Sequence, residues 1–135
     1  MKDADYITDF IEYFLIYVAA KGDKPAFTIF PRYHQLRSTR ALTANLQDFV
    51  EKEDILGKKY LINHSPGSGK TLTISWMAER LDSLFNTVKN EKIIDIVFIL
   101  TDRKSLDTNV KDDLEKFTYL HNNRGLTAKR GLEIN

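Results

Sequence analysis

Apolar residues near the start of the chain recur every three or four positions. Between Tyr6 and Val18 they mark one side of a helix, and Gly22 is placed to end it. The polar side is acidic, whereas helices that lie on membrane surfaces are rich in Lys and Arg. The pattern predicts an N-terminal amphipathic helix that packs on a core, followed by a short linker at Lys21–Pro25.

The same spacing predicts two helices in the middle of the chain. After a brief strand at Phe27–Phe30, Pro31 suits the first turn of a helix that ends before Gly57. Its apolar positions are Leu36, Leu42, Leu46, Phe49 and Val50. A second helix is predicted after Gly69, with one apolar face made by Ile74, Met77, Ala78, Leu81, Leu84 and Phe85.

Two apolar runs predict strands. Lys59–His64 has Tyr-Leu-Ile at its centre, and Ile93–Leu100 is apolar at seven of eight positions. The second run is typical of a strand covered on both faces of a parallel sheet. A further helix, from Leu106 to Leu120, follows it. Strands and helices that alternate with short connections predict an α/β unit with parallel strands, and two or three strands indicate only the opening part of a larger domain.

Composition narrows the class of protein. The chain has 135 residues, of which 42% are hydrophobic, and this describes one soluble domain at most. There is no Cys, which excludes disulfides and thiolate zinc sites, and the net charge of +1 gives no general attraction to nucleic acid or membranes. The longest apolar run, Tyr13–Ala20, is far shorter than the roughly 20 residues that span a bilayer. Acidic residues at the start argue against a secretory signal.

The most informative stretch is His64–Thr71, which we call the phosphate loop. It matches the second half of the pattern GxxxxGK[ST], with His64 where the first glycine is expected. Gly67 and Gly69 allow the backbone N–H groups to turn toward an anion. Lys70 would reach the outer phosphates and the Thr71 hydroxyl would ligate Mg²⁺. The alternative is a Gly-rich connection with an incidental Lys; the GxGxxG pattern of dinucleotide-binding folds is absent.

Three segments in fixed order resemble one known family. They are Pro31–Leu36, Tyr60–Thr71 and Thr101–Asp107, and together they resemble the restriction (R) subunit of type I restriction-modification enzymes, a superfamily 2 translocase. The resemblance implies a partial RecA-like P-loop NTPase unit. On this division, residues 1–24 form an N-terminal helix and linker, and residues 25–135 form an incomplete first RecA-like motor domain.

The resemblance also implies roles for individual residues. Gln35 corresponds to the adenine-contacting glutamine, with Arg32 and Tyr33 beside the base; the alternative is a solvated Gln on a helix surface. Thr101 and Arg103 correspond to a motif that lies along the DNA backbone, although Arg103 could equally be a plain charge at a helix start. The implied ATP-binding set is Gln35, Pro66, Gly67, Ser68, Gly69, Lys70 and Thr71, with Thr71 also the ligand of Mg²⁺.

Two functions remain open from the sequence. No Asp-Glu motif follows Ile93–Leu100, no nuclease pattern Asp…Glu-x-Lys occurs, and no catalytic residue is assigned. The first function is the ATP-binding fragment of a DNA-translocating R subunit, which in the full-length cytoplasmic enzyme would act on double-stranded DNA with methyltransferase and specificity subunits. The alternative is a non-catalytic nucleotide-binding or structural remnant.

Overall fold

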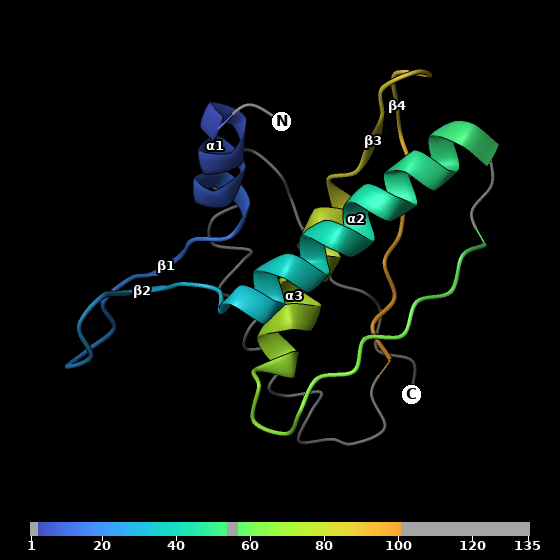
Figure 1. Cartoon of the computed structure of the whole chain (residues 1–135). Coiled ribbons are helices and arrows are strands. Elements are labelled where there is room, and N and C mark those ends of the chain that lie inside the picture. Colours follow the sequence, from blue (N-terminus) through green and yellow to red (C-terminus); the bar gives the residue numbers. More distant parts are fainter. Residues whose placement is uncertain (1–2, 54–56, 101–135) are drawn as a thin grey trace, which may run out of the picture.

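The computed structural model describes residues 3–53 and 57–100. The predicted helix from Leu106 to Leu120 lies outside these residues. The described residues form three helices and two small two-stranded hairpins, and Figure 1 shows their arrangement. The elements in chain order are α1 (Asp3–Tyr13), β1 (Ile16–Val18), β2 (Phe27–Ile29), α2 (Tyr33–Glu53), α3 (Lys70–Asp82), β3 (Phe85–Asn86) and β4 (Glu91–Lys92). The mixed helix and strand composition agrees with the predicted α/β class.

The N-terminal helix is shorter than predicted. It ends at Tyr13, and Ile16–Val18 forms a strand that pairs antiparallel with Phe27–Ile29. Phe14 and Ile16 are both fully buried, an every-second-residue pattern that a strand produces and a helix does not. The predicted linker at Lys21–Pro25 lies in the turn of this hairpin, where Gly22 adopts a φ of 58°.

Helix α2 confirms the prediction made from Pro31 onward. It runs from Tyr33 to Glu53, and Leu46 and Val50 are buried against Leu84 and Ile93. The buried face also carries polar residues, since Thr39 and Thr43 are at most 3% exposed. The Thr43 hydroxyl donates to the carbonyl of Thr39, which satisfies it inside the helix.

Helix α3 begins at Lys70, so its first two residues are the last two of the phosphate loop, and it lies against α2. Its buried face differs from the predicted one, because Trp76 is fully buried while Ile74 is 39% exposed. Trp76 joins Phe14 and Ile16 in one core cluster, and its indole N–H donates to the carbonyl of Phe14 at 3.1 Å. The indole therefore fixes the helix that follows the phosphate loop to the α1–β1 connection.

The connection after α3 contains a small antiparallel hairpin. In strands β3 and β4, Phe85 lies opposite Lys92 and Asn86 lies opposite Glu91. The Glu51 carboxylate of α2 accepts hydrogen bonds from the backbone N–H and the hydroxyl of Thr87, at 3.1 and 2.8 Å. These two bonds, with a third from Gln47, hold the pKa of Glu51 below its usual value.

The prediction of parallel strands is wrong for the described residues. Residues 57–64 and 93–100 are extended in Figure 1 but belong to no sheet, and both sheets that the structure describes are two-stranded and antiparallel. Ile93–Leu100 is not covered on both faces, since Phe98 and Leu100 are 82% and 93% exposed. An extended segment becomes a strand only when a neighbour pairs with its backbone over several residues. Among the described residues, the segment 93–100 has one such bond, from the Ile93 N–H to the Leu84 carbonyl at 3.0 Å, and neither segment is part of a sheet.

Within the described ranges, no helix has the length and apolar character needed to cross a membrane.

Candidate nucleotide-binding site

The phosphate loop turns sharply between its strand-like entry and α3. Gly67 and Gly69 adopt left-handed conformations with φ of 72° and 83°, as expected for residues without a side chain. Gly69 is the N-cap of α3, and no side chain caps the helix. The first N–H groups of α3 are therefore not satisfied by a cap, and together with the helix dipole they favour an anion at this point.

The Lys70 side chain folds back over the loop. Its ammonium donates to the carbonyl oxygens of His64 and Ser65, at 3.1 and 3.0 Å. Both acceptors are neutral, and the side chain is exposed. A phosphate would be a stronger partner than either carbonyl, because its negative charge attracts the ammonium in addition to accepting the hydrogen bond.

Gln35 is buried rather than solvated, with 2% of its surface exposed. Its side-chain oxygen accepts from the backbone N–H of Arg32 at 2.8 Å, which is one half of a capping box at the start of α2. Its side-chain nitrogen donates to the carbonyl of Gly69 at 2.9 Å. The alternative of a solvated surface Gln is therefore wrong: Gln35 joins the start of α2 to the end of the phosphate loop.

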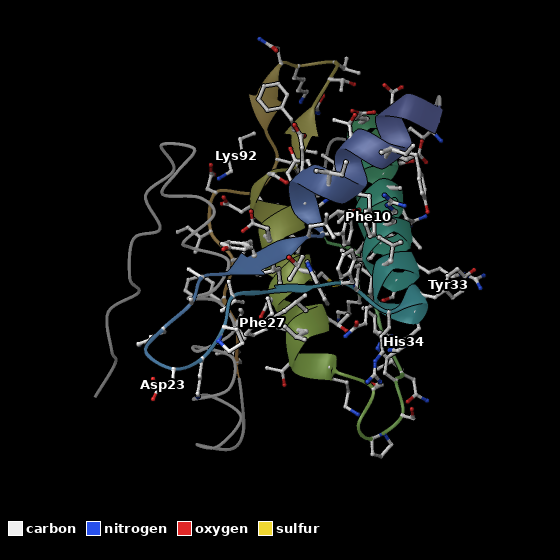
Figure 2. The ribbon with its side chains drawn as sticks, turned by 90° about the vertical axis from the view of Figure 1, so that its left-hand side faces the viewer. Phe10, Asp23, Phe27, Tyr33, His34 and Lys92 are labelled. Carbon is white, nitrogen blue, oxygen red and sulfur yellow. The ribbon has the colours of Figure 1, made fainter. Side chains whose placement is uncertain are left out.

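His34 makes the corresponding contact one residue earlier. Its Nε2 lies 2.9 Å from the carbonyl oxygen of Ser68, and its ring makes a T-shaped contact with the His64 ring at a centroid distance of 4.9 Å. Figure 2 shows His34 beside the loop that precedes α3, whereas Tyr33 extends away from the molecule. Tyr33 is 74% exposed.

A further polar group in the loop is the Ser68 hydroxyl. Ser68 is 8% exposed, and its hydroxyl has no hydrogen-bond partner among the described residues. Buried hydroxyls are rarely left unpaired, so a phosphate oxygen or a water molecule would satisfy it. Thr71, the predicted Mg²⁺ ligand, lies in the first turn of α3 and is partly exposed.

The part of the chain that the structure describes has no group of three or more His, Cys, Asp or Glu that could hold a metal ion. A Mg²⁺ ion here would therefore depend on the Thr71 hydroxyl and on oxygens of the bound phosphates. This donor set suits Mg²⁺, which prefers oxygen ligands and usually binds through substrate phosphates and few protein groups.

The structure brings the predicted ATP-binding residues together, although they come from two separate segments. Gln35 contacts Gly69, while Pro66 to Thr71 form the loop and the first turn of α3. The predicted DNA-binding residues, Thr101 and Arg103, lie outside the described residues. The contact of His34 with Ser68 could not be predicted from the sequence, because the two residues are 34 positions apart and no helical or strand spacing relates them.

Comparison with known proteins places the chain in a family. The family model for the SWI2/SNF2 ATPase matches residues 34–133, and the chain belongs to this family. The match begins at His34, so it includes both α2 residues that contact the loop.

The particular resemblance predicted from the motifs is also confirmed. The chain is 30% identical over 108 residues to a protein of Methanocaldococcus jannaschii whose name assigns it as a type I restriction enzyme MjaVIIIP endonuclease subunit. The aligned region covers 80% of this chain and 10% of that relative. No solved structure gives a significant match.

Proposed function

We propose that this chain binds Mg-ATP through the phosphate loop as part of the first, RecA-like motor domain of a type I restriction enzyme R subunit. The observation that carries the proposal is the loop itself: two left-handed glycines, an uncapped α3 and the adjacent Lys70. Such a loop supplies convergent N–H groups and one mobile positive charge, which is the chemistry that a phosphate chain requires. The SWI2/SNF2 ATPase family match supports ATP as the ligand.

Each loop residue has a part in this binding. The N–H groups at the start of α3 hold the phosphate oxygens, and Lys70 exchanges its two carbonyl partners for the outer phosphates. The Thr71 hydroxyl holds Mg²⁺. When bound, Mg²⁺ neutralises charge on the phosphate chain.

Gln35 is the proposed contact for adenine. A primary amide can donate two hydrogen bonds and accept two, and the two contacts of Gln35 use one of each. The remaining donor and acceptor suit the edge of an adenine ring. Because Gln35 is buried, contact with the base requires the amide to move toward the surface or the base to approach the start of α2 closely.

We further propose that the chain binds nucleotide without turnover on its own. The sequence contains no Asp-Glu motif after Ile93–Leu100, and a phosphate loop alone supplies neither a carboxylate for the metal nor a group that orients the attacking water. Double-stranded DNA, contacted through Thr101 and Arg103, and the methyltransferase and specificity subunits are partners proposed for the full-length cytoplasmic enzyme. The alternative is a non-catalytic nucleotide-binding or structural remnant without ATPase or nuclease activity.

Thermal unfolding tests the binding proposal. Mg-ATP or Mg-ADP should raise the melting temperature of the chain, because a ligand that binds only the folded state stabilises it. The Lys70→Ala variant should lose the rise, while Lys24→Ala, an exposed lysine in the β1–β2 turn, should keep it. Mg-GTP should give a smaller rise than Mg-ATP if Gln35 contacts the base. Equal shifts in the wild-type chain and Lys70→Ala would contradict the assignment.

A further inference from the structure

Two successive carbonyl groups of the phosphate loop are held by two successive side chains of α2. The Ser68 carbonyl accepts from His34, and the Gly69 carbonyl accepts from Gln35, each at 2.9 Å. A carbonyl oxygen can only accept, so His34 must carry its proton on Nε2. The Gly69 carbonyl also accepts the backbone N–H and the hydroxyl of Thr73, at 3.1 and 3.2 Å.

Because the peptide bond is planar, a contact that holds a carbonyl group also fixes the direction of the next N–H group, which can face the anion. In a trans peptide the C=O of one residue and the N–H of the next point in opposite directions, and the chain has no cis bonds in its described part. Holding the Ser68 carbonyl toward α2 therefore aims the Gly69 N–H away from α2. Holding the Gly69 carbonyl does the same for the Lys70 N–H.

We propose that His34 is a positioning residue of the nucleotide site: it fixes the Ser68–Gly69 peptide so that the Gly69 N–H faces the phosphates. The inference rests on the proposed function and deepens it, since it states that side chains in the first turn of α2 orient the N–H groups of the phosphate loop. Gln35 fixes the following peptide in the same way. The recognised chemistry is the phosphate chain, not the base, because the groups that His34 orients are loop N–H donors.

The proposal predicts how variants at position 34 differ. In the glutamine side chain the amide nitrogen lies about as far from the backbone as Nε2 of histidine, whereas in asparagine it is one bond shorter. His34→Gln should therefore retain the contact with the Ser68 carbonyl, and His34→Asn should lose it. Losing one net hydrogen bond that orients the loop should weaken binding roughly fivefold.

The experiment is calorimetric titration of the full chain with three probes: Mg-ATP, Mg-GTP and inorganic tripolyphosphate with Mg²⁺. His34→Ala and His34→Asn should weaken the binding of all three probes by the same factor, and His34→Gln should bind them with wild-type affinity. Arg37→Ala, an exposed residue on the same helix, serves as the control and should change none of them. In ¹⁵N spectra, the His34 ring should carry its proton on Nε2, and the Gly69 amide signal should move in His34→Asn but not in His34→Gln.

The outcomes separate the two proposals. If the wild-type chain binds none of the probes, the proposed function fails and with it this inference. If the wild-type chain binds and Lys70→Ala does not, but His34→Ala and His34→Asn bind as wild type does, the function stands and the positioning role of His34 is wrong. Weaker binding of Mg-ATP alone would also overturn the positioning role of His34, because it would indicate that His34 contacts the base.

Discussion

Gly69 is restricted in two independent ways. Its φ of 83° lies in the left-handed region, and a Cβ at this position would come within 2.6 Å of the Gln35 side-chain nitrogen. Gly67 has a similar φ of 72°, but a Cβ there would meet nothing within 4 Å. Both glycines therefore require a left-handed backbone conformation, and only at Gly69 is there also no room for a Cβ.

This difference predicts unequal costs for the two alanine variants. Gly67→Ala should lower the free energy of unfolding by about 1–2 kcal/mol, the cost of a left-handed alanine. Gly69→Ala should lower the free energy of unfolding further, because its Cβ must also displace the Gln35 side chain. Urea unfolding without nucleotide measures both. In a Gln35→Ala background the two variants should become equally destabilising, and a difference that persists there would show that Gln35 is not what makes Gly69 special.

At the scale of elements, α1 is fixed to the two longer helices by one carboxylate. Asp9 accepts from Arg40 of α2 at 2.8 Å and pairs with Arg80 of α3 at 3.2 Å. The three side chains are only 16–19% exposed. Arg40 also lies 3.7 Å above the ring of Tyr6, and Arg80 lies 4.2 Å above the ring of Tyr13. The two guanidinium groups thus bind α1 by charge and by cation–π contact.

Asp9→Ala should therefore destabilise the chain clearly. Removal of the carboxylate leaves two largely buried guanidinium groups without their anionic partner. Hydrogen bonds to charged groups are worth about 1.5–3 kcal/mol. Asp48→Ala is the matched control, because the Asp48–Lys52 pair on α2 is more than 60% exposed on both sides and its loss should have little effect on stability. Urea unfolding checks both variants; equal losses would refute the bridging role of Asp9.

The elements that sequence predicted well are those with a local signal. Helix α2 follows from spacings of three and four residues, and the left-handed turn at Gly67 and Gly69 follows from a contiguous glycine pattern, so both could be found without a structure. The end of α1 could not, because Ile16–Val18 becomes a strand only through pairing with Phe27–Ile29. Contacts such as Gln35 with Gly69 or Asp9 with Arg40 join residues more than 30 positions apart, and no sequence period encodes them.

At the scale of the whole molecule, apolar side chains lie exposed along two extended segments. Leu61 is 93% exposed in the segment that enters the phosphate loop, and Ile96, Phe98 and Leu100 are 68%, 82% and 93% exposed in the segment after β4. In Figure 1 both segments, drawn in green and orange, run from the upper part of the molecule toward the lower. Extended segments with exposed apolar residues and unpaired backbone favour association with another chain.

Hydrogen exchange and association state test this property. Amides of residues 94–100 should exchange much faster than those inside α2 and α3, because they belong to no helix or sheet in the structure. The wild-type chain should associate as its concentration rises, and Phe98→Lys should reduce that association without changing the response to Mg-ADP. Val88→Lys, at a residue 76% exposed in the β3–β4 turn, should leave the association unchanged. Slow exchange at residues 94–100 in a stable monomer would show instead that this segment is protected in solution.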